Sequence, residues 1–182
     1  MNVHRLWLGS VSVLILLSRA VSAQEVALRA SAARMQERIL RLAEFGKDPR
    51  GGVSRVAFSE ADLRGRAYII SLMRQAGLAV RVDPAGNIIG RREGRQSHLP
   101  PIVFGSHIDS VPNGGRYDGV VGVIGAIECI EVLNAHGVTT QHPLEVIVFA
   151  DEEGGLVGSR ALIGTLTQEA LAVVSASGKT VR

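Results

Sequence analysis

The chain has 182 residues, of which 46% are hydrophobic and 20% are charged, a composition typical of a folded globular domain and not of a disordered or fibrous chain. Its formal net charge of +3 would fall to +1 without residues 1–23, because these contain Arg5 and Arg19 and no acidic residue. So small a charge gives no reason to expect a nucleic-acid partner.

The first residues resemble a secretory signal peptide. Met1–Arg5 carries positive charge, residues 6–17 are apolar, and Val21-Ser22-Ala23 is a small-residue cleavage motif. We expect cleavage after Ala23 and a secreted or periplasmic protein. No stable membrane span is expected after cleavage, since the apolar run is shorter than the ~20 residues a span needs. An uncleaved amino-terminal anchor is the alternative.

The first half of the mature chain is predicted to form two helices and a hairpin. The first helix has an apolar stripe at steps of three and four residues and ends at Gly46; the stripe comprises Leu28, Ala32, Met35, Ile39 and Leu42. The second begins at Ser59, with Asp62 in a capping-box-like position, and ends at Gly77. Its predicted inner stripe is Leu63, Ala67, Ile70 and Met73. Residues 78–82 then alternate as a half-buried strand, and a turn at 84–87 leads to a short strand around Ile88.

The second half is predicted to be a strand, a buried helix, a strand and a further helix. The strands are residues 101–105 and 144–150, and the helices are 119–136 and 159–166. A strand, helix and strand in this order indicate a right-handed crossover and a parallel pair. Gly119, Gly122 and Gly125 would allow the buried helix to approach the sheet closely. The single cysteine, Cys129, lies in this apolar helix and is interpreted as a small buried side chain.

Two stretches rich in potential metal ligands follow the two strands. Residues 105–119 (GSHIDSVPNGGRYDG) offer His107, Asp109 and Asp118, and residues 149–155 (FADEEGG) offer Asp151, Glu152 and Glu153. The carboxyl ends of neighbouring strands converge on one crevice, so these side chains are expected to meet there. Imidazole with carboxylates suits zinc and similar divalent ions, which favours metal-dependent hydrolysis. Taken singly, Asp118 could be a helix cap, His107 a core histidine, and Glu152 and Glu153 a solvated pair.

Together with GSRALIG at residues 158–164, these stretches resemble the amidase, hydantoinase and carbamoylase branch of the M20 metallopeptidase clan. This branch includes N-carbamoyl-L-amino-acid hydrolases, allantoate amidohydrolases and beta-ureidopropionases. The compact Gly-Gly-Arg-Tyr loop before Asp118 is similar to this branch, whereas in the clan's carboxypeptidases and deacylases the corresponding aspartate lies further from the histidine. The resemblance implies an α/β three-layer sandwich with a mostly parallel sheet.

The resemblance also implies a role for each candidate residue. His107 would bind one metal ion, Asp118 would bridge two, and Glu153 would bind the second. Asp109 would orient His107, and Glu152 would be the general base. The cofactors would be two divalent ions, zinc or manganese, with cobalt or nickel also compatible. The substrate would be a small molecule with a linear amide or ureido carbon–nitrogen bond.

Some expectations concern the rest of the enzyme. The family's later histidine ligands and its dimerisation domain have no counterpart in residues 24–182, so we expect a partial catalytic domain with little activity alone. A homodimer is implied for the full-length family and not for this fragment. The sequence after Glu153 departs from many carbamoylases, which leaves the substrate open. Arg116 could meet a substrate carboxylate or be a solvated loop residue.

Two other functions are compatible with the sequence. One is an exopeptidase or aminoacylase of the same clan, and the other is a non-catalytic remnant or binding module.

Overall fold

The computed structural model describes residues 27–180, so the predicted signal peptide lies outside the described part of the chain. A four-stranded sheet is its centre, with the strand order β1-β2-β4-β3. The strands are β1 (Ala79–Val82), β2 (Ile88–Arg92), β3 (Ile102–His107) and β4 (Leu144–Phe149). The helices are α1 (Ala32–Ala43), α2 (Glu60–Gln75), α3 (Val120–Ala135), α4 (Val157–Leu162) and α5 (Gln168–Leu171).

The sheet is mixed, which corrects the expectation of a mostly parallel one. β3 pairs with β4 in parallel, as the intervening helix α3 requires, and His107 lies opposite Phe149 in the register. β1 pairs with β2, and β2 with β4, in antiparallel fashion. The tight turn between β1 and β2 is too short for a crossover, so the hairpin must run antiparallel. The α/β class is confirmed.

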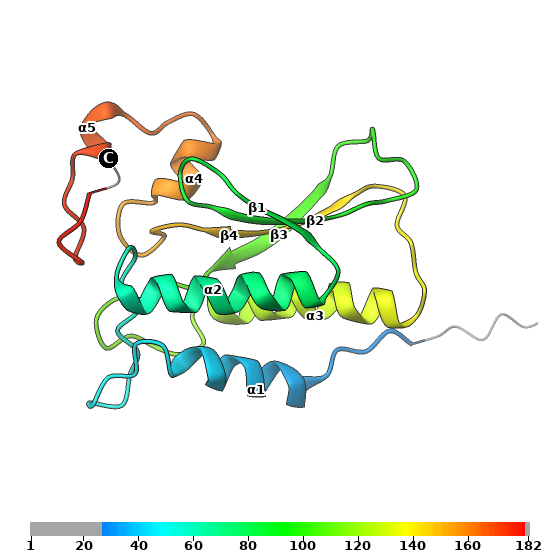
Figure 1. Cartoon of the computed structure of the whole chain (residues 1–182), viewed down its shortest axis with the longest axis horizontal. Coiled ribbons are helices and arrows are strands. Elements are labelled where there is room, and N and C mark those ends of the chain that lie inside the picture. Colours follow the sequence, from blue (N-terminus) through cyan, green and yellow to red (C-terminus); the bar gives the residue numbers. More distant parts are fainter. Residues whose placement is uncertain (1–26, 181–182) are drawn as a thin grey trace, which may run out of the picture.

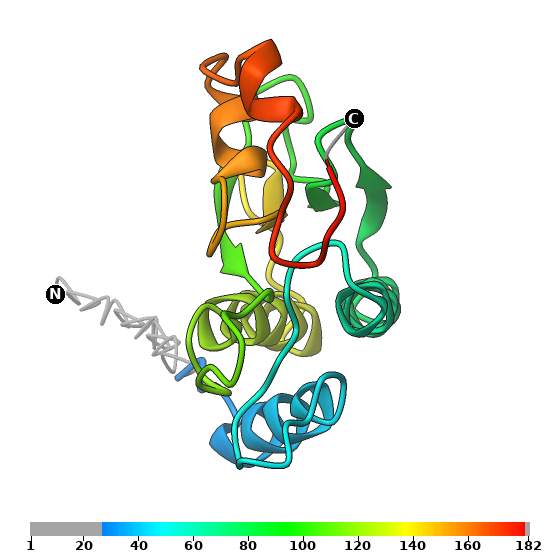
Figure 2. The ribbon, with the colours of Figure 1, turned by 90° about the vertical axis from the view of Figure 1, so that its left-hand side faces the viewer.

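The helices form layers on the sheet (Figure 1). α2 and α3 lie side by side against one face, and α1 packs on the outer side of α3. The short helices α4 and α5 lie at the other side of the sheet, near the end of β4. Figure 2 shows the same order of layers after a quarter turn, with α1 furthest from α4 and α5. None of the helices between residues 27 and 180 has the length and apolar character needed to span a membrane.

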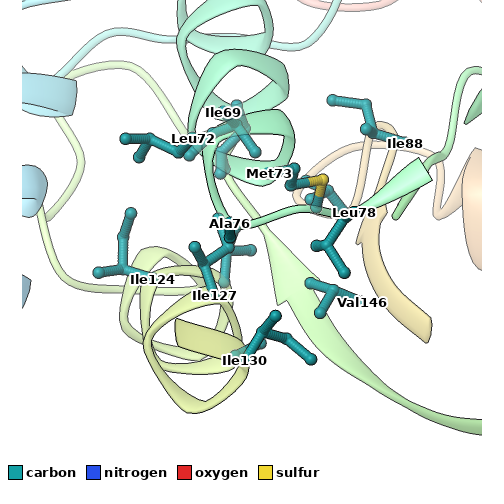
Figure 3. Close-up of a cluster of buried hydrophobic side chains, with 14 of the residues drawn as sticks. Ile69, Leu72, Met73, Ala76, Leu78, Ile88, Ile124, Ile127, Ile130 and Val146 are labelled. Carbon is teal, nitrogen blue, oxygen red and sulfur yellow. The ribbon is translucent and has the colours of Figure 1, made fainter. Parts of the chain in front are cut away.

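The core lies between the sheet and the α2–α3 layer (Figure 3). Ile69 and Met73 of α2 meet Ile124 and Ile127 of α3, and Val146 of β4 closes the cluster from the sheet. All five side chains are fully buried. Burying side chains of this size stabilises the fold by roughly 1.5–3 kcal/mol each.

The buried face of α2 differs from the predicted stripe. Leu63 is 50% exposed, and the buried positions are Asp62, Gly65, Ile69, Leu72 and Met73. Asp62 turns inward because its carboxylate accepts the Phe58 N–H at 2.9 Å. Gly65 is buried against Arg55, and a Cβ at this position would lie 2.8 Å from Arg55 Cδ. Buried polar contacts therefore determine which face of α2 points inward, and the pattern of apolar residues in the sequence could not predict them.

Two single-residue expectations are also wrong. Leu28 lies before α1 and is 46% exposed, so the stripe of this helix packs only from Met35 onward. Cys129 is exposed on α3. The apolar residues of α3 do not all face the protein, since Val121 is 44% exposed as well.

Candidate metal centre

The parallel pairing of β3 and β4 brings the two ligand-rich stretches together. His107 is the last residue of β3, and the segment with Glu152 and Glu153 begins just after Phe149, its register partner. Gly119, the N-cap residue of α3, lies directly against the imidazole, and any Cβ at this position would overlap the His107 ring. With a φ of 62°, Gly119 also adopts a backbone conformation that favours glycine.

The three predicted metal ligands converge. One donor atom each from His107, Asp118 and Glu153 lies within 4.8 Å of the other two. The His107 Nε2 atom is 3.7 Å from Asp118 Oδ2 and 3.5 Å from Glu152 Oε2. The imidazole is buried, whereas Asp118 and Glu153 are exposed, so the group opens to solvent on its carboxylate side.

The backbone fixes the orientation of His107. Its Nδ1 atom lies 3.1 Å from the carbonyl oxygen of Asp109 and 3.6 Å from Asp109 Oδ1. Since both oxygens can only accept, Nδ1 carries a proton, and Nε2, which faces Asp118 and Glu152, is the ring atom that can bind a metal ion once its own proton is lost. The neutral ring then has the tautomer that a metal ligand needs.

The site concentrates negative charge around one imidazole. Burial alone would lower the pKa of His107, but the Asp109 carboxylate and the charge of Glu152 outweigh it and raise the pKa to about 9. The pKa of Glu153 is raised by partial burial and by the neighbouring Asp118 carboxylate. The negative charges of neighbouring carboxylates repel each other, and a bound cation would remove this repulsion. The group therefore fits a divalent ion both in its electrostatics and in its donor atoms.

Asp109 connects the two ligand-bearing segments. It is 4% exposed, and its Oδ2 atom accepts the backbone N–H of Glu153 at 3.0 Å. Its Oδ1 atom has no hydrogen-bond donor among the described residues and faces the His107 ring. Asp109 thus fixes the position of Glu153 relative to His107.

Asp151 lies apart from the other acidic residues of its segment. Its side chain is buried and accepts the Gly155 N–H at 2.8 Å, so it closes a local turn. Burial raises its pKa. Asp151 is therefore a structural residue of the segment and is not among the converging ligands.

The other histidines of residues 27–180 and Arg116 do not join the ligand group. His98 and His136 are exposed. His142 contacts the carbonyl oxygen of Pro100, and these two residues precede β4 and β3, at the opposite ends of the strands from the ligand group. Arg116 is exposed and donates to the Gly51 carbonyl oxygen at 3.3 Å. Within residues 27–180, His107 is the one histidine in the candidate metal group.

Arg55 was not identified as a site residue from the sequence. It is 1% exposed, and its guanidinium donates to the carbonyl oxygens of Ile108 at 2.6 Å, Leu42 at 2.9 Å and Phe45 at 3.0 Å. Ile108 lies between His107 and Asp109, so Arg55 holds the turn that carries both. Burial lowers the pKa of Arg55 to about 10, which keeps it charged at neutral pH. An arginine in a glycine-rich stretch gives no sequence signal of burial.

A cavity of about 290 Å³ borders the site. Asp109 and Glu153 reach it from the ligand-bearing segments, and apolar side chains such as Phe58, Val111 and Val157 line it. The cavity therefore offers space for a small molecule beside the candidate metal group.

Comparisons with known proteins agree with this architecture. The sequence model of Peptidase family M28 matches residues 87–176, which include the whole ligand group. The N-carbamoyl-L-amino acid amidohydrolase of Geobacillus stearothermophilus is 47% identical over 150 residues, which are 80% of this chain and 37% of that protein. The ureidoglycolate hydrolase of Arabidopsis thaliana is 43% identical over 143 residues, or 76% of this chain and 30% of that protein.

A solved structure shows the same fold. The hydantoinase/carbamoylase family amidase from Burkholderia ambifaria superimposes with a TM-score of 0.80 at 38% identity, covering 85% of this chain and 40% of that one. The chain thus spans only 30–40% of the length of these relatives, and 76–85% of the chain aligns with them.

Proposed function

Because the chain belongs to the hydantoinase/carbamoylase branch of amidohydrolases and spans only part of its members' length, we propose that it supplies part of the active site of a metal-dependent hydrolase. The proposed reaction is hydrolysis of a linear, non-peptide carbon–nitrogen bond in a small amide or ureido compound. The observation that carries the proposal is the convergence of His107, Asp118 and Glu153 within 4.8 Å.

The ligand roles that we propose are those implied by the resemblance to the carbamoylase branch, and the convergence of the three side chains supports them. His107 and Glu153 would each hold one of two divalent ions, and Asp118 would be a ligand of both. Zinc or manganese suits this donor set, and cobalt or nickel is also compatible. When bound, such ions supply polarisation of a carbonyl and activation of water. The described residues provide three ligands, so further ligands would have to come from outside residues 27–180.

Glu152 is the proposed general base. Its Oε2 atom lies 3.5 Å from His107 Nε2, at the edge of the ligand group but outside the set of three. A carboxylate there can take a proton from a water at the site and return it to the departing nitrogen. Asp109, hydrogen-bonded to Glu153 N–H and facing His107, is proposed to orient both segments.

The wider assignments rest on the sequence. We propose that residues 1–23 are a cleaved signal peptide, that the protein is secreted or periplasmic, and that residues 24–182 are a partial catalytic domain with little activity alone. A homodimer is proposed only for a protein with the full length of the relatives. The cavity beside Glu153 supports a small-molecule substrate.

A chimeric enzyme tests the function. Residues 27–180 would replace the matching segment of the Geobacillus stearothermophilus relative, and hydrolysis of N-carbamoyl amino acids would be compared with that of dipeptides and N-acyl amino acids. We expect activity on the carbamoyl compounds. Glu152→Gln should lower kcat at least about 100-fold because the base is lost, while metal content is kept.

The same assay separates the alternatives. Preference for dipeptides or N-acyl amino acids would favour the exopeptidase or aminoacylase reading, which the match to a peptidase family keeps relevant. A folded chimera that binds no metal and hydrolyses nothing would favour a non-catalytic remnant. Full activity of the Glu152→Gln chimera would remove Glu152 from the base role.

A further inference from the structure

The segment that carries Glu152 and Glu153 is held at both ends by one buried side chain from another part of the chain. Asn87 lies at the end of the β1–β2 turn and is completely buried. Its Oδ1 atom accepts the N–H of Ala150 at 3.1 Å, and its Nδ2 atom donates to the carbonyl oxygen of Gly158 at 3.0 Å. Ala150 directly precedes the acidic segment, and Gly158 follows it in α4.

The two ends also bind each other. The Gly158 N–H donates to the Ala150 carbonyl oxygen at 2.9 Å, so residues 151–157 form a closed loop with Asn87 at its base. Within this loop Asp151 and Leu156 both adopt a φ of 54°. Such left-handed conformations are unfavourable for residues other than glycine, and they persist only where the surroundings fix them.

Asp83 fixes the orientation of the Asn87 amide. Its Oδ2 atom accepts from Asn87 Nδ2 at 2.8 Å, while its Oδ1 atom accepts the backbone N–H of Asn87 at 2.9 Å. Because a carboxylate only accepts, the amide nitrogen must face Asp83, and the amide oxygen is left for Ala150. Both N–H groups and the oxygen of the Asn87 side chain are thereby used.

Only an asparagine fits this place among residues of its size. An aspartate could not donate to Gly158 and would face the Asp83 carboxylate, and a leucine would leave the Ala150 and Gly158 groups without partners. Gly158 has no room for a side chain either, because a Cβ there would overlap Asn87 Oδ1 and lie 2.6 Å from Ala150 N. The contact therefore requires both an asparagine at position 87 and a glycine at position 158.

We propose that Asn87 is a positioning residue that sets the place of Glu152 and Glu153 opposite His107. It touches neither the ligand group nor the cavity beside it. Its effect would pass through the fixed ends of the loop and through the Glu153 N–H, which Asp109 holds from the other segment. The catalytic roles of Glu152 and Glu153 rest on the proposed function. The hydrogen bonds by which Asn87 fixes the loop do not depend on it.

Hydrogen exchange in the full chain tests the proposal. In Asn87→Asp, we expect the amides of Glu153 and Gly155 to exchange at least about tenfold faster, with the paired amides of β4 unchanged, because only the loop is released. Gly158→Ala, which displaces the same amide from the other side, should have the same effect. Asn134→Asp is the matched control, since Asn134 Nδ2 also bridges two elements by donating to Ala76 at 2.9 Å, away from the loop.

A second readout concerns the metal. Titration with Mn²⁺ should show an apparent Kd raised about 10- to 100-fold in Asn87→Asp and unchanged in Asn134→Asp. Unchanged loop exchange in both loop variants would overturn the proposal. Equal acceleration in the control, or loss of protection throughout β4, would overturn it as well. A wild-type chain that binds no Mn²⁺ but shows the expected exchange would contradict the proposed function and leave the role of Asn87 intact.

Discussion

His107 is constrained on every side that the structure describes. The Asp109 carbonyl oxygen lies by Nδ1, Gly119 lies against the ring, and Nε2 faces Asp118 and Glu152. Each neighbour limits either the tautomer or the rotation of the imidazole. The ring is thus already oriented as a ligand without any contribution from an ion.

The protonation of His107 leads to a prediction on pH. In the metal-free chain the ring should titrate near pH 9, because Asp109 and Glu152 outweigh the effect of burial on its pKa. Its folded pKa lies above the ordinary 6.5, so the protonated ring stabilises the metal-free fold fully below pH 6.5, and this contribution is lost as pH rises through about 9.

A metal ion at the proposed site would compete with a proton for Nε2 of His107. The apparent affinity for Mn²⁺ should therefore rise from pH 7 to pH 9 and level off above. An NMR titration of the His107 ring with and without Mn²⁺ measures this, with His107→Gln to assign the signal. A midpoint near 6.5 in the metal-free chain would contradict the electrostatic account.

The site also shows which ligands the sequence could predict. His107, Asp118 and Glu153 were expected to converge because their segments follow neighbouring parallel strands, and the structure brings them together. Three acidic residues in a row could not be separated by type alone. The left-handed backbone at Asp151 turns its carboxylate toward Gly155, and that conformation depends on tertiary contacts.

At the scale of elements, Arg55 joins α1 to the turn after β3. Its guanidinium is the donor for the carbonyl oxygens of Ile108, Leu42 and Phe45. Arg55→Met would remove this donor and leave the three carbonyl oxygens without a hydrogen bond from residue 55 in the protein interior. We expect the free energy of unfolding to fall by about 3 kcal/mol, measured by urea denaturation followed by circular dichroism.

Arg50→Met is the matched control for this variant. Arg50 lies in the same glycine-containing stretch but is exposed and pairs with Asp48 at the surface. Its replacement should leave the urea midpoint unchanged within error, because exposed ion pairs contribute little. Equal midpoints for the Arg55 variant and the wild type would show that the buried guanidinium does not support the fold.

The elements differ in how far the sequence predicts them. The start of α2 at Ser59 is confirmed, since its side chain accepts the Asp62 N–H at 3.2 Å, and the crossover from β3 through α3 to β4 is confirmed. The buried face of α2 was predicted only in part: Met73 is buried as expected, whereas Leu63 is exposed and the face also contains Asp62 and Gly65. The antiparallel place of β2 beside β4 was also missed, since strand order depends on contacts distant in sequence.

At the scale of the whole molecule, the described chain presents one side of a candidate metal site. One histidine and two carboxylates converge at the carboxyl ends of β3 and β4, and the carboxylates are exposed. Two fifths of the length of related amidohydrolases is covered. A site of this kind should bind a divalent ion specifically but weakly, because catalytic ions usually have at least three protein ligands each.

Paramagnetic broadening by Mn²⁺ tests the central claim most directly, because it detects weak binding. Substoichiometric Mn²⁺ added to the ¹⁵N-labelled full chain should broaden the amide signals around His107, Asp118 and Glu153 first. The effect should vanish in His107→Ala with Glu153→Gln and persist in His136→Ala. Broadening that is centred elsewhere, or that survives loss of both ligands, would contradict a metal centre at these strand ends.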